Sequence, residues 1–156
     1  MAYKHNAPFH ADVVGSYLRP AELKAAREDF AAGKIDAAEL KAVEDKAITE
    51  LVTKQKATGL HVITDGEFRR AYWHLDFMWG LQGVSKGTNP VAVHGSNGSE
   101  VTETAAVSGE ISGENHPFIE HFKFVKQFED DNTVAKITVP SPAQTLFLLQ
   151  AGAAED

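Results

Sequence analysis

HVITDGEFRRAYWHLDF, residues 61–77, is a short apolar run that stops abruptly at charged residues. Residues 61–64 are partly β-branched and follow Gly59, which predicts a buried strand preceded by a helix. Gly66 permits a sharp turn because it has no Cβ. In α/β folds, ligands bind beyond the carboxyl ends of buried strands, so the residues after Thr64 are candidates for a binding site.

Strand and helix patterns alternate on both sides of this stretch, which is typical of a parallel α/β fold. The capping pair Asp36 and Glu39 predicts the start of a long helix, and Gly59 lies just past its end. Residues Leu40, Val43, Ala47, Ile48, Leu51 and Val52 share one face of that helix. The other expected core strands are 10–14 and 134–139, and the other expected helices are 21–30, 117–128 and 143–151.

The segment 91–113 is rich in Gly, Ser, Thr and Val and predicts a β-hairpin insertion in an otherwise single unit, 1–156. Three strand–helix units are too few to close a (β/α)8 barrel. An incomplete parallel sheet has an unpaired edge, and such an edge favours association with another chain. We therefore expect a homo-oligomer that forms through this edge.

Composition excludes several classes of function. The chain has 156 residues, 43% of them hydrophobic, which suits one globular unit with a core. A net charge of −7 argues against binding to nucleic acid. We expect a cytoplasmic protein, because neither a signal peptide nor an apolar run of membrane-spanning length is recognisable. Cysteine is absent, which excludes disulfides and thiolate ligands for zinc.

Two motifs, VVGSYLRP at 13–20 and TDGEFRRAYWHLDF at 64–77, together resemble the N-terminal part of the cobalamin-independent methionine synthase family. The similarity is greatest to the stand-alone proteins that resemble its catalytic barrel, and it extends from about residue 10 to 142. The resemblance implies the first three units of a (β/α)8 TIM barrel. It also implies a zinc-dependent methyltransferase that transfers a methyl group from methyltetrahydrofolate to the thiol of homocysteine, in methionine biosynthesis.

The Gly15–Ser16 pair and Glu67 are the main candidates for binding an amino acid. Backbone N–H groups and a hydroxyl after the first strand can bind a carboxylate, and the resemblance makes Gly15 and Ser16 the clamp for homocysteine. A simple turn is the alternative. The resemblance makes Glu67 the ligand of the α-amino group, whereas the alternative is an ion pair with Arg69 or Arg70. Asp65 is expected to orient Glu67 or the neighbouring backbone.

Arginine and aromatic residues supply further candidates. Arg19, Arg69 and Arg70 could bind the carboxylates of a folate tail, or could pair with nearby acids. Trp73 and His74 could line the pocket, with the indole stacked on a pterin or packed on substrate, or could serve packing alone. Trp79 lies in an apolar run and is expected to be structural.

A metal site is not expected in this chain. His116 and Glu120 are spaced to touch one ion, with His121 nearby, but two ligands near a helix end rarely make a site. In the resembled family, zinc is bound by His, Glu and Cys residues from the later part of the barrel. The chain alone is therefore expected to be inactive, with no catalytic residue assigned.

Two hypotheses of function follow. In the first, the chain is the N-terminal part of a homocysteine methyltransferase, as a natural truncation or a fragment, and contributes the half of the site that binds the amino acid. In the second, it is a catalytically inactive α/β module for binding or self-assembly. Neither hypothesis involves nucleic acid or a membrane, and the expected ligand is homocysteine or a similar thiol amino acid.

Overall fold

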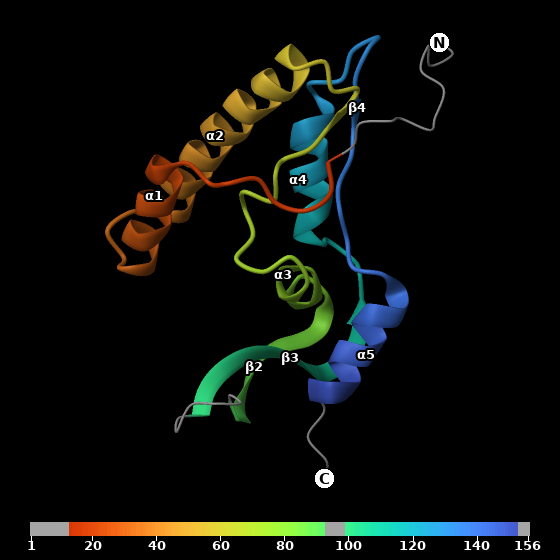
Figure 1. Cartoon of the computed structure of the whole chain (residues 1–156). Coiled ribbons are helices and arrows are strands. Elements are labelled where there is room, and N and C mark those ends of the chain that lie inside the picture. The colour runs from red at the N-terminus through yellow and green to blue at the C-terminus, as the bar shows by residue number, and fades with distance from the viewer. Residues whose placement is uncertain (1–12, 93–98, 153–156) are drawn as a thin grey trace. The chain divides into compact units, whose positions relative to one another are not determined.

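The computed structural model describes residues 13–92 and 99–152, which form two compact units (Figure 1). The first unit combines the chain up to Arg70 with Glu120–Thr138, and the second combines Ala71–Ile119 with the chain from Val139 onward. Whether the two form one domain, as the sequence predicts, stays a prediction.

Two helices cover the first unit, α1 at Ala21–Ala31 and α2 at Ala37–Ala57, and they pack side by side (Figure 1). The predicted capping box is present at the start of α2. Asp36 Oδ1 accepts a 2.8 Å hydrogen bond from the Glu39 N–H, and Glu39 Oε2 accepts a 2.9 Å bond from the Asp36 N–H. Such a cap satisfies two backbone N–H groups that the first turn leaves free.

A short parallel sheet lies beside these helices. Strand β1, Val62–Ile63, pairs in parallel with β4, Val134–Ala135, so both 61–64 and 134–139 contain strand residues, as expected. The ladder is shorter than predicted. Beyond the paired residues, Lys136 N–H donates to the Ile63 carbonyl, and residues 137–139 are not in a strand.

The expected first strand, 10–14, is only partly within the described chain. Residues 10–12 lie outside it, and Val13 and Val14 are not in a strand. Lys136 Nζ nevertheless donates to the Val13 carbonyl, which places the start of the described chain beside the residues that follow β4.

The core of the first unit is built from α1, α2, β1, the turn after β1, and α4. Helix α4 spans Pro117–Lys126. Each fully buried aliphatic or aromatic side chain contributes about 1.5–3 kcal/mol. The buried apolar residues of this cluster are Leu23, Ala47, Ile48, Val52, Ile63, Phe68 and Val125.

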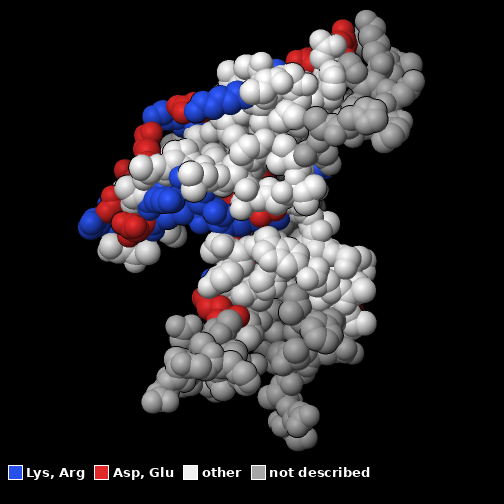
Figure 2. All heavy atoms as spheres, in the orientation of Figure 1, with Lys and Arg blue, Asp and Glu red and all other residues white. Residues whose placement is uncertain are grey.

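The surface of α1 and α2 mixes both charges, as Figure 2 shows for the face in view. Lysine side chains form ion pairs with acidic neighbours on these helices and on the loop between them, as in Lys46 with Glu22 and Lys41 with Asp45. Exposed pairs of this kind add little to stability. This face is therefore a solvated helical surface.

The second unit is built on an antiparallel hairpin. Strand β2, Gln82–Ala92, pairs with β3, Ser99–Ser112, and the helices α3, Leu75–Trp79, and α5, Pro142–Gly152, pack on it. The hairpin begins well before the predicted segment 91–113. Its buried apolar cluster consists of Leu75, Met78, Ala105 and Leu149.

The fold is α/β with two small sheets, and the described residues form no closed barrel. The incomplete TIM barrel expected from the resemblance is therefore not confirmed by the strand pairing. No helix in the described ranges is both long and apolar enough to cross a membrane.

Candidate functional site

The turn that follows β1 is a compact structure built from its own side chains. Thr64 Oγ1 accepts a 3.1 Å hydrogen bond from the Gly66 N–H, and Asp65 Oδ1 accepts a 2.9 Å bond from the Glu67 N–H. The Arg70 N–H then donates to the Glu67 carbonyl at 3.1 Å. Asp65 thus contacts the neighbouring backbone at the Glu67 N–H, and its role in orienting Glu67 stays a prediction.

Gly66 is required at the centre of this turn. Its φ is +63°, and a Cβ built on it would lie 2.4 Å from Leu51 Cδ2 and 3.2 Å from Tyr17 Cδ2. A larger residue would therefore be strained and would clash with α2. The polar turn can pack directly on the apolar core for this reason.

Glu67 is held in a backbone conformation that non-glycine residues rarely adopt. Its φ is +57°, and its side chain is buried. Such a conformation costs about 1–3 kcal/mol and is concentrated at functional sites. Burial of a carboxylate adds a further cost unless the group is paired. The conformational cost therefore falls on the residue that the sequence singles out, and the burial cost depends on the partners of its carboxylate.

The Glu67 carboxylate has two neighbours from the first unit. The Thr138 hydroxyl donates a 2.7 Å hydrogen bond to Glu67 Oε1, and Arg70 Nη1 lies 3.6 Å from the same oxygen. The ion pair between Glu67 and Arg70, which the sequence suggests as the alternative role of Glu67, is therefore present, with a long separation between the two groups. Arg69 instead pairs with Glu44 and Asp45 on α2.

Arg19 fixes the backbone of the turn. Its Nη2 donates to the carbonyls of Glu67 and Arg70, at 2.9 and 2.6 Å. Arg27 on α1 donates to the Phe68 carbonyl in the same way. These guanidinium groups together hold three carbonyls of the turn, those of residues 67, 68 and 70, which stabilises the unusual conformation of Glu67. Binding of a folate tail by Arg19 stays a prediction.

The first motif lies against this turn. The Tyr17 N–H donates to the Gly66 carbonyl at 3.1 Å, which is a direct contact between the two motifs. Gly15 and Ser16 immediately precede Tyr17 in the chain. Gly15 has φ +85°, and Ser16 is exposed. An open hollow of about 340 Å³ is lined by Ser16, Tyr17, Leu18, Arg19 and Lys24.

Asp65 has an unusual environment for a carboxylate. The residue is 3% exposed, and its Oδ2 is buried without a hydrogen-bond partner among the described residues. An unsatisfied buried acceptor costs about 1–3 kcal/mol. The turn therefore contains one buried carboxylate oxygen without a donor among the described residues, whereas Oδ1 of the same group accepts from the Glu67 N–H.

Trp73 and His74 belong to the second unit. Trp73 is 45% exposed, and its ring lies 4.6 Å from that of His74. Burial lowers the pKa of the His74 imidazole, against a smaller opposing effect of Asp76. Whether these two side chains line a substrate pocket stays a prediction.

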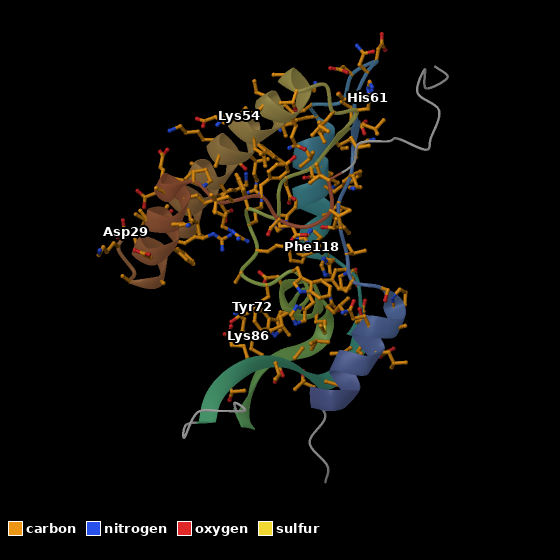
Figure 3. All side chains as sticks on the ribbon, viewed as in Figure 1. Asp29, Lys54, His61, Tyr72, Lys86 and Phe118 are labelled. Carbon is orange, nitrogen blue, oxygen red and sulfur yellow. The ribbon has the colours of Figure 1, made fainter. Side chains whose placement is uncertain are left out.

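Trp79 has the contacts of a structural residue, as expected. Its indole N–H donates a 3.0 Å hydrogen bond to the Thr104 carbonyl. Tyr72 and Lys86, both labelled in Figure 3, contact its ring, with centroids 6.0 Å apart for Tyr72 and Nζ 4.2 Å from the centroid for Lys86. The tryptophan thereby connects α3 to the hairpin.

His116 is occupied by structural contacts. Its Nε2 lies 2.8 Å from the Phe77 carbonyl, and its Nδ1 accepts from the Phe118 N–H at 3.1 Å. The ring nitrogens therefore act as one donor and one acceptor, which leaves no lone pair for a metal. Within 13–92 and 99–152, no group of three or more His, Cys, Asp or Glu side chains could hold an ion.

Three side chains that hold the turn after β1 were not predicted from the sequence, those of Thr138, Arg27 and Gln55. The Gln55 amide bonds both the N–H and the carbonyl of Thr64. Thr138 lies at the end of the predicted strand 134–139, and carboxyl ends of neighbouring parallel strands meet at one edge of a sheet. That rule, applied to 134–139, would have drawn attention to it. The sequence contains no comparable signal for Arg27, whose partner is a backbone carbonyl.

Residues 9–139 match the cobalamin-independent synthase, catalytic domain. The chain belongs to this family. Both motifs, the turn after β1 and Thr138 lie inside the matched range, so the site described above is within the family's catalytic domain.

Members of the family with sequence similarity to this chain differ in how well they are understood. The uncharacterized protein YxjG of Bacillus subtilis is 42% identical over 140 residues, which are 90% of this chain and 37% of that protein. A methionine synthase of Sulfurisphaera tokodaii is 31% identical, over 83% of this chain and 37% of its own length.

A solved structure supports the same relationship. The putative vitamin-B12 independent methionine synthase of Listeria monocytogenes is 44% identical, with a TM-score of 0.74 over 92% of this chain and 39% of that protein. The chain thus spans less than two fifths of the relatives that it matches.

The zinc of this family does not fit the described residues. The chain has no cysteine, the described ranges contain no group of three potential ligands, and both His116 nitrogens are engaged. We therefore assign no zinc ligand in this chain and derive no reaction step through the metal.

Proposed function

We propose that this chain supplies the amino-acid-binding half of a methionine-synthase-like methyltransferase, with homocysteine or a similar thiol amino acid as ligand. The methyl donor proposed with it is a methyltetrahydrofolate, as the family suggests. The observation that carries the proposal is the buried Glu67 carboxylate, held at positive φ directly after β1.

An α-ammonium group suits the charge of this turn. A charge-assisted hydrogen bond from an ammonium to Glu67 is stronger than one between neutral groups. Asp65 Oδ2 lacks a donor among the described residues, so a cationic ligand would also offset a cost that the free protein bears. These features support Glu67 as the ligand of the amino group and Asp65 as the residue that orients it.

A carboxylate suits the neighbouring hollow. Ser16 contributes a hydroxyl, and Arg19 and Lys24 are cationic residues in its lining. Oriented N–H groups of a Gly-Ser turn are favourable for anions. An amino acid that bridges Ser16 and Glu67 would present its side chain away from both motifs, where the remainder of a full-length relative supplies further groups.

Isothermal titration calorimetry with homocysteine and with methionine tests the proposal. We expect Glu67→Gln to weaken binding by roughly tenfold to a hundredfold, because it removes a charge-assisted bond. Ser16→Ala should weaken it by a smaller factor. Glu50→Gln, an exposed change on α2, is the matched control and should leave binding unchanged. Unaltered binding in both site variants would overturn the proposal.

A second candidate is a non-catalytic module that self-associates. Among the described residues, β1 and β4 pair only with each other, so this sheet has unpaired edges. Light scattering coupled to size exclusion should then give a mass that is a multiple of one chain. A monomer at all accessible concentrations would contradict self-association, and binding of homocysteine would favour the first candidate over this one.

A further inference from the structure

We propose that Thr138 is a positioning residue that prepares Glu67 for an α-ammonium group, and thereby makes the site select amino acids over thiol acids that lack the amine. The inference rests on the proposed function, because it assigns a role within the same site. Thr138 lies in the loop after β4 and is 71 positions from Glu67 in the sequence.

The contact between the two residues has the geometry of a strong hydrogen bond. The Thr138 hydroxyl donates to Glu67 Oε1 at 2.7 Å, a distance typical of bonds from a hydroxyl to a carboxylate. The Glu67 side chain is only 7% exposed, so few water molecules compete with this bond.

Arg70 determines the direction of that bond. Its Nη2 donates to the Thr138 carbonyl at 2.8 Å, and its Nη1 lies 3.4 Å from the Thr138 hydroxyl oxygen. A guanidinium group can only donate, and an ionised carboxylate can only accept. The hydroxyl between them must therefore accept from Arg70 and donate to Glu67, so its proton points at the carboxylate.

This arrangement leaves one carboxylate oxygen for a ligand. Thr138 engages Oε1, and no hydrogen bond reaches Oε2 of Glu67 from the described residues. Arg70 Nη1 remains 3.6 Å from Oε1, beyond ordinary hydrogen-bond distance. The threonine hydroxyl thus contacts both the guanidinium and the carboxylate, whose ion pair stays long at 3.6 Å.

Removal of the hydroxyl should let that ion pair close. Without the hydroxyl, no polar side-chain group of Thr138 lies between Arg70 Nη1 and Glu67 Oε1, which are already 3.6 Å apart, and a close pair between a guanidinium and a carboxylate is favourable in a buried site. A carboxylate engaged by Arg70 offers less to an ammonium group. The loss should therefore fall on ligands that carry an amine.

The test compares homocysteine with 4-mercaptobutanoate, which has the same carboxylate and thiol but no amine. In calorimetric titrations we expect Thr138→Val to weaken homocysteine binding by roughly tenfold and to leave 4-mercaptobutanoate binding unchanged. Thr138→Ser retains the hydroxyl and should retain the selectivity. If the valine variant does not fold by circular dichroism, Thr138→Ala carries the same expectation.

The outcomes separate this inference from the proposed function. If the unaltered protein binds homocysteine, Glu67→Gln weakens it, and Thr138→Val changes neither ligand or weakens both equally, the positioning role alone is overturned. An equal loss for both ligands is what a purely structural threonine would produce. If the unaltered protein does not bind homocysteine, both proposals are overturned.

Discussion

Gln55 and Thr64 exchange two buried hydrogen bonds across the boundary between α2 and β1. Gln55 Nε2 donates to the Thr64 carbonyl at 2.8 Å, and the Thr64 N–H donates to Gln55 Oε1 at 3.0 Å. The Gln55 amide thus makes the two backbone hydrogen bonds of Thr64 that a neighbouring strand would otherwise make. Thr64 is the last residue before the acidic turn. The helix therefore fixes the point at which the site begins.

Replacement of Gln55 by leucine should destabilise the protein strongly. The side chain is 2% exposed, and its loss leaves the N–H and carbonyl of Thr64 buried without partners. Two unsatisfied groups of this kind cost about 2–4 kcal/mol in the free energy of unfolding. Urea unfolding monitored by circular dichroism measures the difference. Gln144→Leu, on an exposed position of α5, is the matched control, and equal losses in the two variants would contradict this account.

Gly80→Ala should also be destabilising, for a steric reason. A Cβ at Gly80 would lie 2.6 Å from His116 Nε2, and that ring is held by its bonds to Phe77 and Phe118. Overpacking in such a fixed environment costs about 1–3 kcal/mol. Gly113→Ala is the control, because nothing lies within 4 Å of its Cβ position. Thermal unfolding should separate the two variants, and an unchanged midpoint for Gly80→Ala would show that the ring can move.

Stability should fall in acid in part through Asp130. Its carboxyl pKa is held well below the ordinary 3.8, first by the hydrogen bond from Lys56 Nζ and then by those from Asn132 and Thr133. A lowered pKa in the folded protein means that the unfolded chain takes up the proton first as the pH falls. The stabilisation is therefore complete above about pH 4 and is lost below it.

Asp130→Asn should flatten this dependence. Melting temperatures recorded between pH 7 and pH 2 should fall less steeply for the variant than for the unaltered protein. Lys56→Met, which removes the largest cause of the lowered pKa, should reduce the slope in the same direction. An identical slope in all three proteins would mean that other acids control the acid sensitivity.

Interactions between residues close in sequence were predictable in this protein. The capping pair Asp36 and Glu39 lies within one turn of helix, and the apolar face of α2 repeats at helical spacing, so both can be recognised without knowledge of the tertiary structure. The turn after β1 was recognisable because an apolar run, Gly66 and Glu67 occur together. The alternation of strands and helices predicted parallel strands, as β1 and β4 are, but it did not predict which strands pair.

Features that depend on distant contacts were not predictable in the same way. The hairpin begins at Gln82 because β2 pairs along its length with β3, although glycines and Pro90 interrupt the β pattern of its sequence. The role of Arg19 as a backbone clamp depends on carbonyls 48 and 51 positions away, and carbonyls have no sequence signature. Thr138 has no distinctive local pattern in its β-branched run, and only its place near the carboxyl end of the predicted strand 134–139 could have drawn attention to it.

Zinc content provides a final prediction. Protein purified without chelators should contain well below one zinc ion per chain by atomic emission, because the described residues offer no group of three ligands and cysteine is absent. His116→Gln and Glu120→Gln should leave this low content unchanged, although His116→Gln should lower stability through loss of the ring contacts with Phe77 and Phe118. A stoichiometric content that falls in either variant would show that these residues bind metal, and would reverse the structural interpretation of His116.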